Sequence, residues 1–409
     1  MENSIEKNYS HRHFRSDRFW QSLPGWQSVS HEQFGDYKWQ LRNSIKSTND
    51  MKSVLQDLLR ESDYQDIESA LSKSPMNIRI TPYLFSLINW ADFRSDPIRK
   101  QFIMLGSEQI PDHPKSSKDP LFEDFDSYSS LITHRYPDKV LFLPISICPV
   151  YCSYCTRSRL VGNSTIATKK ETYGAKSGNW EQAFQYLEEH PEVEDVVISG
   201  GDAMLLRPDQ IEAIGARLVS IPNVRRVRFA SRFLSSCPQI VITDTEWLKC
   251  LENVYRLAKR QVAIHTHFCS PNEVTDWTRK AMNKLFSIGI TVRNQCVLLK
   301  GVNDDPDTMS LLNRRLSYIN IQPYYVYLHD MVRGTEHLRT SLRVAIDLEK
   351  KVRGTTAGYN TPAFVCDVSG GGGKRQVSSF ESYCETTGIS TWVAPGVKPG
   401  QLFYHYDPK

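Results

Sequence analysis

The sequence has no hydrophobic run long enough to cross a lipid bilayer. Its longest apolar stretch, residues 140–147, is short and contains Pro144, whereas a membrane-spanning helix needs about 20 apolar residues. The first 18 residues are polar and charged and lack the apolar segment of a secretory signal. Charge of one sign is also scarce, because the formal net charge is only +4 over 409 residues. These features argue against a membrane or a nucleic acid as a partner.

Paired cysteines are missing as well. The nine cysteines are odd in number and scattered, so they form no disulfide framework, and we expect a reducing, cytoplasmic location. The sequence instead places Cys148, Cys152 and Cys155 in one C-x3-C-x2-C run, directly after an apolar segment. Three thiolates this close can bind an iron–sulfur cluster and leave one iron open to a substrate or cofactor. A zinc site is the alternative, but no second C-x2-C pair is present to complete it.

Beyond residue 125, short apolar runs alternate with helical patterns. The predicted strands are 140–145, 196–199, 226–230, 262–268, 291–299 and 324–328. The predicted helices are 180–189, 208–218, 245–258, 276–288 and 307–318. Strands and helices in alternation are typical of a parallel α/β sheet, so we expect a partial or full (β/α) barrel. In such barrels the chemistry takes place at the carboxyl ends of the strands.

We expect the chain to have three parts. Residues 1–125 carry helical patterns and form an N-terminal helical region, followed by a polar linker around residues 115–130. Residues 126–345 form the barrel core. Residues 346–409 form a C-terminal segment that begins after the last predicted β/α unit.

Two glycine-rich elements stand near the predicted strands. Gly200, Gly201 and Asp202 follow the second strand, where adjacent glycines let a ligand approach the backbone closely. A tight turn is the alternative for this element. Residues 370–373 are four glycines that directly precede Lys374.

The glycine run before Lys374 is not a P-loop. The first glycine of that motif is missing, and Arg375 stands where a serine or threonine is required. A flexible glycine tether suits a lysine that must move aside when a substrate amine replaces it on pyridoxal phosphate (PLP). A flexible surface loop is the alternative interpretation.

In combination, the three cysteines, the Gly-Gly-Asp element and the glycine–lysine segment resemble the lysine 2,3-aminomutase family of radical S-adenosylmethionine (SAM), PLP-dependent enzymes. The resemblance covers most of the chain and includes residues 131–141, 265–268, 294–304 and 323–330. It implies an isomerase that interconverts L-lysine and β-lysine by a 1,2-amino shift. It also implies a [4Fe–4S] cluster, SAM and PLP as cofactors, a small-molecule amino acid as substrate, and a reductant for the cluster.

The resemblance assigns roles to individual residues. Cys148, Cys152 and Cys155 would bind the cluster, and Lys374 would be the catalytic lysine that bonds to PLP. Contacts to PLP are implied for Arg135, Tyr136 and Lys139, contacts to SAM for Gly200, Gly201 and Asp202, and positions facing SAM or the reaction chamber for His267 and Gln295. Arg157 would bind the substrate carboxylate in two hydrogen bonds.

Two aspartates matter most for the choice of substrate. Asp330 and Asp367 each follow an apolar strand-like run, where an unpartnered buried carboxylate would be costly. By the resemblance, they receive the side-chain ammonium group of lysine. Arginine or another basic amino acid is the alternative substrate, and a protein- or peptide-bound lysine is another.

The chain also departs from the family pattern. Tyr154 stands where lysine enzymes commonly have histidine, and Asp305 stands where a zinc-binding cysteine would fall. We therefore expect no intersubunit zinc site, and the oligomeric state stays open, with a homo-oligomer as one form. Other functions to weigh are RNA modification, a cysteine–metal binding module, and a hydrolytic metal site at His265 and His267.

Overall fold

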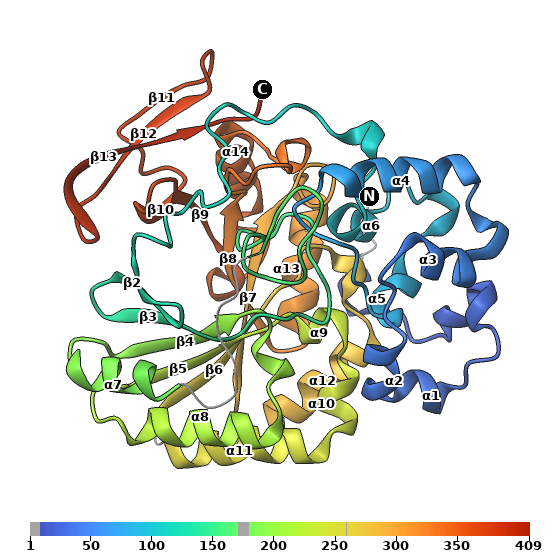
Figure 1. Cartoon of the computed structure of the whole chain (residues 1–409), viewed down its shortest axis with the longest axis horizontal. Coiled ribbons are helices and arrows are strands. Elements are labelled where there is room, and N and C mark those ends of the chain that lie inside the picture. The colour runs from blue at the N-terminus through green and yellow to red at the C-terminus, as the bar shows by residue number, and fades with distance from the viewer. Residues whose placement is uncertain (1–8, 171–179, 259) are drawn as a thin grey trace, which may run out of the picture.

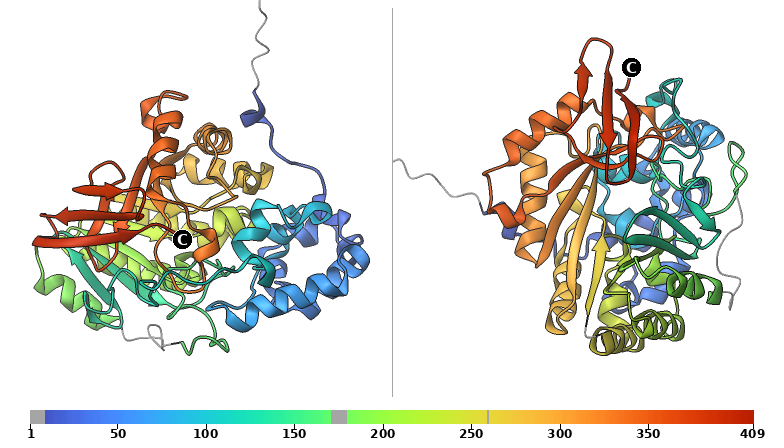
Figure 2. Two further views of the ribbon diagram at one scale, coloured as in Figure 1. Left: turned by 90° about the horizontal axis from the view of Figure 1, so that it is seen from above. Right: turned by 90° about the vertical axis from the view of Figure 1, so that its left-hand side faces the viewer.

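The computed structural model describes residues 9–170, 180–258 and 260–409. Part of the polar N-terminal stretch, residues 1–8, therefore lies outside the described residues. A large curved sheet occupies the middle of the molecule, with helices on its outer face and a helical region at one side (Figure 1). A small separate sheet lies near the C-terminus (Figure 2).

Ten strands form the large sheet in the order of the sequence. They are β1 (Ser127–Ser129), β2 (Ile132–Tyr136), β3 (Lys139–Ile145), β4 (Asp195–Gly200), β5 (Arg226–Ala230), β6 (Gln261–Thr266), β7 (Thr291–Leu298), β8 (Ile321–Leu328), β9 (Ala363–Val368) and β10 (Gly373–Gln376). Strands β3 to β9 pair in parallel, and an antiparallel hairpin stands at each edge. Among the described residues β1 and β10 do not pair, so the sheet is a partial barrel and not a closed one.

Of the helices between the strands, the five that begin at Glu181, Pro208, Thr245, Asp276 and Pro306 agree closely with the predicted ranges, and the others were not predicted. In chain order these helices are α7 (Glu181–Glu189), α8 (Pro208–Ser220), α9 (Phe233–Ser236), α10 (Gln239–Thr243), α11 (Thr245–Ala258), α12 (Asp276–Ser287), α13 (Pro306–Tyr318) and α14 (Leu342–Val352). Their buried apolar faces form one core with the sheet, in which Val196, Val227 and Val262 are almost fully enclosed. The predicted α/β class is confirmed, and of the two barrel forms the partial one is present.

The register of the parallel strands brings their carboxyl ends to one edge. Val196 pairs with Val140 on one side and Val227 on the other, and Val227 pairs in turn with Val262. Because neighbouring strands are in phase, the loops that follow β3, β4, β5 and β6 begin side by side. Residues far apart in the sequence can therefore meet there.

The N-terminal region packs around its own aromatic core. Its helices are α1 (His31–Gly35), α2 (Tyr37–Arg42), α3 (Thr48–Leu55), α4 (Glu61–Lys73), α5 (Pro82–Leu87) and α6 (Pro97–Phe102). Trp20 stacks on Phe34, with 4.0 Å between the ring centroids. Val150, from the loop after β3, belongs to the same core. The three-part division at residues 125 and 345 stays a prediction.

The C-terminal segment is mostly β structure, which the sequence analysis did not predict. After the β9–β10 hairpin, β11 (Ser382–Cys384), β12 (Ile389–Ala394) and β13 (Lys398–Tyr406) form an antiparallel sheet. Trp392 of β12 is fully buried and lies beside Phe380, with the ring centroids 6.0 Å apart. The small sheet covers the edge of the molecule near β9 (Figure 2).

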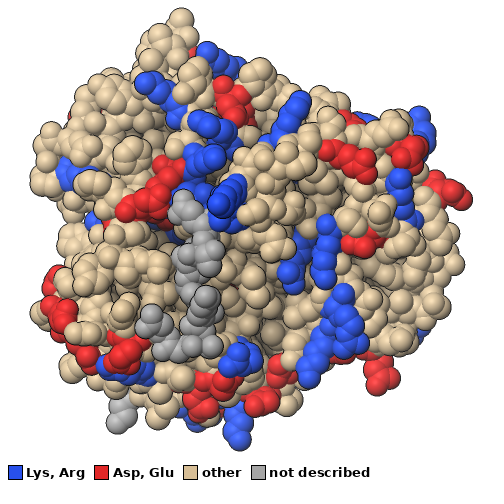
Figure 3. Space-filling view, viewed as in Figure 1, with Lys and Arg blue, Asp and Glu red and all other residues tan. Residues whose placement is uncertain are grey.

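Surface charge is mixed on the face that Figure 3 presents, where lysines and arginines lie among aspartates and glutamates. None of the helices in the described ranges is long and apolar enough to span a membrane.

A buried glycine gives a test of the packing between α8 and α11. A Cβ atom added to Gly215 would lie only 2.3 Å from Cγ2 of the fully buried Val254. Overpacking costs about 1–3 kcal/mol, which outweighs a helix-propensity gain of about 1 kcal/mol. We therefore expect Gly215→Ala to lower the free energy of unfolding, measured by chemical denaturation.

Two further variants control this test. Gly396→Ala should change stability little, because nothing lies within 4 Å of a Cβ at that position. Combining Gly215→Ala with Val254→Ala should cost less than the sum of the two single changes, since the smaller residue 254 makes room. Equal stability of Gly215→Ala and the native chain would contradict this packing.

Candidate active site

A cavity of about 550 Å³ lies on the inner face of the curved sheet. Predicted site residues that line it are Arg135, Tyr136, Lys139, Cys152, Cys155, Arg157, Gly200, His267, Gln295, Asp330, Asp367 and Lys374. These residues come from both edge hairpins, the central strands and the loop after β3. Of the predicted set, Cys148, Gly201 and Asp202 are not among the residues that line the cavity.

The three cysteines lie on the loop that follows β3, residues 146–161, which we call the cysteine loop. Cys152 and Cys155 reach the cavity, whereas Cys148 and Cys155 also pack beside Met76 and Tyr151. Backbone hydrogen bonds fix the loop to the N-terminal region. The Tyr151 N–H donates to the carbonyl of Arg79, and the Ser153 N–H donates to that of Gln101, both at 2.9 Å.

The thiols are not arranged as a finished metal site. In the described ranges no three His, Cys, Asp or Glu side chains converge in metal-binding geometry. Burial raises the pKa of all three thiols, that of Cys155 to about 11, and the charges of the neighbouring thiols add to this effect for Cys148 and Cys155. The thiols therefore hold their protons until a metal displaces them. Three thiols on one loop are a donor set that fits an iron–sulfur cluster.

The Gly-Gly-Asp element joins the cysteine loop to the rest of the sheet. A Cβ on Gly201 would lie 2.1 Å from the carbonyl oxygen of Ile147, so only glycine fits this close approach. The Asp202 N–H donates to the same Ile147 carbonyl at 2.9 Å. The Asp202 carboxylate accepts from the backbone N–H groups of Met204 and Arg232. The Asp202 carboxylate thus binds backbone N–H groups in this structure, and the SAM contact expected of Asp202 stays a prediction.

Lys374 lies on β10 directly opposite Asp367 of β9. Its Nζ is 2.9 Å from Oδ2 of Asp367, and its backbone N–H donates to the Tyr136 hydroxyl at 3.0 Å. Residues 370–372 lie in the turn of the β9–β10 hairpin and Gly373 begins β10, so the flexibility of this tether stays a prediction. Positive φ angles of 84° and 86° at Gly370 and Gly371 explain why glycine is needed there.

The two predicted aspartates share the cavity, but their surroundings differ. Asp330 accepts a hydrogen bond of 2.6 Å from Thr156 through Oδ2, while its Oδ1 is buried without a hydrogen-bond partner in the described part of the chain. Burial, with the charge of Asp367 added, raises the pKa of Asp330 to about 7. Burial also acts on Asp367, but the cations Lys374 and Arg135 outweigh it and lower the pKa of Asp367. An added cation would therefore favour ionised Asp330.

Both predicted arginines are held by carboxylates of the segment 115–130, which the sequence analysis treated as a linker. Arg157 makes a two-pronged contact with Glu123, at 2.9 Å from Nε and 2.6 Å from Nη2. Arg135 donates from Nε to Asp126 at 2.6 Å. Glu123 and Asp126 are site residues that the analysis missed, although their acidic run in front of an Arg-Tyr segment is visible in the sequence.

Lys139 and the Tyr136 ring together form one wall of the cavity, on which Lys139 carries a positive charge. The Lys139 ammonium lies 3.7 Å from the centre of the Tyr136 ring, within cation–π distance. Burial, with the charges of Lys374 and Arg228 added, lowers the pKa of Lys139 to about 8. A bound anion would relieve this repulsion, so the wall suits a phosphate group.

The two histidines at the end of β6, His265 within the strand and His267 just after it, do not act as one unit. The His265 ring contacts Gln295, with 2.6 Å between Nδ1 and Nε2, whereas Nε2 of His267 lies 2.9 Å from the Tyr154 hydroxyl and 3.3 Å from Sγ of Cys269. With the rings turned to different partners and no metal-binding group among the described residues, the hydrolytic alternative has no support in the geometry.

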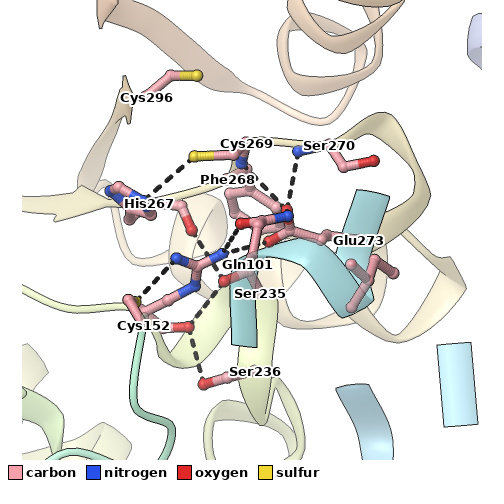
Figure 4. Close-up of polar contacts among 12 residues, drawn as sticks. Gln101, Cys152, Ser235, Ser236, His267, Phe268, Cys269, Ser270, Glu273 and Cys296 are labelled. Atoms are coloured by element: carbon pink, nitrogen blue, oxygen red, sulfur yellow. Dashed lines mark hydrogen bonds and ion pairs between the residues drawn. The ribbon is translucent and has the colours of Figure 1, made fainter. Parts of the chain in front are cut away.

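The sequence analysis also missed the residues behind the cysteine loop. Arg232 and Glu273 form a buried ion pair of 3.0 Å, with side-chain exposures of 7% and 0%. Figure 4 labels Gln101, Cys152 and Glu273, which are hydrogen-bond partners of the Arg232 guanidinium. Neither residue stands in a recognisable motif, and only the fold brings them beside Cys152.

Comparison with known proteins places the chain among amino acid mutases. No family model matches it. An L-lysine 2,3-aminomutase of Acetoanaerobium sticklandii is 37% identical over 349 residues, which are 85% of this chain and 80% of that protein. Another, of Methanococcus maripaludis, is 38% identical over 346 residues, 85% of this chain and 76% of that one. A glutamate 2,3-aminomutase of Clostridioides difficile is 32% identical over 373 residues, 90% and 83% of the two chains.

Among solved structures, a radical SAM methyltransferase from Sphaerobacter thermophilus is 17% identical, with a TM-score of 0.37. That likeness covers 58% of this chain and 68% of the methyltransferase. The sequence relatives each exceed 30% identity over more than three quarters of both chains. The chain therefore belongs to the lysine 2,3-aminomutase family.

Proposed function

We propose that this protein is a radical SAM, PLP-dependent 2,3-aminomutase that interconverts L-lysine and β-lysine. Family membership supports the coarser activity, an isomerase that shifts the amino group of an amino acid with SAM and a [4Fe–4S] cluster. We further propose that the amino acid is lysine and that PLP is the second cofactor. The observation that carries it is the contact of Lys374 with Asp367, inside a cavity that Cys152 and Cys155 also line.

The residues of the cavity fit the cofactors. Cys148, Cys152 and Cys155 would hold the cluster, and Lys374 would bond to PLP with Lys139 near the phosphate. When bound, the reduced cluster and SAM supply a radical that takes a hydrogen atom from the substrate, and PLP supplies the π-system through which the amino group migrates. The protein contributes position, charge and the exclusion of water.

The ion pair of Lys374 and Asp367 suggests how the substrate side chain is received. In the ligand-free protein the Lys374 ammonium satisfies Asp367. A Lys374 engaged by PLP would no longer hold its ammonium against this carboxylate, and Asp367 would then need another cation. The ammonium of a substrate lysine can take that place, with Asp330 as its second acceptor.

The substrate carboxylate requires a different partner. The guanidinium of Arg157 presents a planar fork toward Glu123, and the same fork can bind a substrate carboxylate if the side chain turns within the cavity. Glutamate as substrate would bring a third carboxylate next to Asp330 and Asp367, which is unfavourable. A cavity of this size on the inner face of the sheet suits a free amino acid better than a lysine within a folded protein.

Removal of the proposed PLP lysine tests the function directly. We expect Lys374→Ala to lose amino migration, because PLP loses its covalent anchor, while SAM cleavage by the cluster continues at a reduced level. β-Lysine and 5′-deoxyadenosine are measured by chromatography after anaerobic reconstitution. Lys351→Ala, an exposed position on α14, is the control and should keep both products. Amino migration at the native rate in Lys374→Ala would exclude the proposed role.

The raised pKa of Asp330 gives a prediction about pH. A substrate ammonium stabilises the ionised carboxylate, and Asp330 loses its proton near pH 7, so the KM for lysine should fall as the pH rises from about 6 to 8. Asp330→Asn should raise KM by about tenfold to a hundredfold, the value of a charged hydrogen bond, and abolish this pH dependence.

Steady-state kinetics across this pH range checks both statements. Asp347→Asn, on the half-exposed face of α14, is the matched control and should follow the native profile. A native pH profile in Asp330→Asn would show that another group binds the substrate ammonium.

A further inference from the structure

We propose that Arg232 is a positioning residue of the cluster: its buried guanidinium holds Cys152 and raises the reduction potential of the iron–sulfur cluster. This inference rests on the proposed function only in assuming a cluster on the three cysteines. It concerns a residue in none of the sequence motifs described above.

Arg232 lies where β5 ends and α9 begins, and its backbone is held on two sides. Its N–H donates to the Asp202 carboxylate at 2.7 Å, and its carbonyl accepts hydrogen bonds from both the backbone and the hydroxyl of Ser236. The Gly-Gly-Asp element is bonded in turn to Ile147, at the start of the cysteine loop. These bonds hold the ends of β3, β4 and β5 together without any contact from the Arg232 side chain.

The guanidinium divides its hydrogen bonds between the protein interior and the cavity. On the interior side, Nη2 donates to Oε1 of Gln101 at 2.6 Å and to Oε2 of Glu273 at 3.0 Å. On the cavity side, Nη1 donates to Sγ of Cys152 at 3.1 Å and to the Tyr154 hydroxyl at 2.7 Å. Arg232 therefore connects a fixed interior anchor to a cluster cysteine.

The interior anchor is rigid because all of its polar atoms are used. Oε1 of Glu273 accepts from Gln101 Nε2 and from the backbone N–H groups of Cys269 and Ser270, at 2.8 to 3.1 Å. Glu273 has no solvent exposure, so these bonds do not compete with water. Figure 4 shows this arrangement, with Gln101 and Glu273 on one side and Cys152 and His267 on the other.

The contacts of Arg232 also extend, through the Tyr154 hydroxyl, to His267 on the cavity wall. The Tyr154 hydroxyl, which accepts from Arg232, lies 2.9 Å from Nε2 of His267. Tyr154 stands between Cys152 and Cys155 in sequence and is buried. One guanidinium thus orients both a cluster cysteine and, through one hydroxyl, a histidine that lines the cavity.

The positive charge of Arg232 beside Cys152 must raise the electron affinity of a cluster bound there. Reduction adds one electron to the oxidised cluster and makes it more negative, which a neighbouring positive charge favours. Hydrogen bonds to the cysteine sulfur act in the same direction. Glu273 carries the opposite charge on the far side of Arg232 and partly offsets this effect.

The test is a redox titration of the reconstituted cluster, followed by electron paramagnetic resonance without substrate. Arg232→Gln should shift the midpoint potential to a more negative value, because it removes the charge and the bond to Cys152. Arg232→Lys should lie between that variant and the native protein. Glu273→Gln should shift the potential the other way, to a less negative value, since it leaves the charge of Arg232 unopposed.

Opposite shifts separate an electrostatic role from general damage, which would move the variants in one direction. Arg99→Gln breaks the 2.7 Å ion pair between the buried Arg99, on the helix that carries Gln101, and the partly exposed Glu108, and should leave the potential unchanged. If Arg232→Gln does not retain a cluster, the shift in Glu273→Gln decides alone. Native potentials in the variants that hold a cluster would overturn this inference, whereas absence of any cluster in the native protein would overturn the proposed function.

Discussion

The position of the cysteine loop depends on one close approach between backbones. Gly201 passes so near to Ile147 that no side chain fits, and the neighbouring N–H groups of residues 201 and 202 bond to the end of β3 and the start of the loop. Because β3, β4 and β5 are in phase, this contact also brings Arg232 within reach of Cys152. A larger residue at 201 would separate the strand ends and move the three thiols away from the cavity.

Charge balance is the second constraint on the site. Six cationic side chains and five acidic ones line a single cavity, and close ion pairs among them include Lys374 with Asp367, Arg157 with Glu123 and Arg228 with Asp195, while Arg232 pairs with a glutamate just outside the lining. Pairing of this kind keeps buried charges tolerable in the absence of ligands. Most of these cations thus already have an acidic partner within 4 Å.

The sequence predicted the central β/α units well because their apolar periodicity and glycine-rich ends are local features. Most of the predicted site residues also meet in one cavity, since they lie in motifs near strand ends. The β11–β13 sheet escaped prediction because β11 has only three residues and most residues of β13 are exposed, so no apolar run marks them in the sequence. Glu123 and Asp126 were missed because a polar, turn-rich segment looks like a linker until its arginine partners are known. Arg232 and Glu273 could not be found, because burial of an ion pair is a property of the fold.

In the hairpin of β9 and β10, the number of glycines in the turn decides which face of the sheet the Lys374 side chain points to. Asp367 faces the cavity, while its neighbours Cys366 and Val368 are fully enclosed in the core. A strand alternates its faces residue by residue, so a turn shortened or lengthened by one glycine would shift the pairing and carry Lys374 to the core side. An insertion of the kind that most surface loops accept would here leave the sheet intact but turn Lys374 away from the cavity.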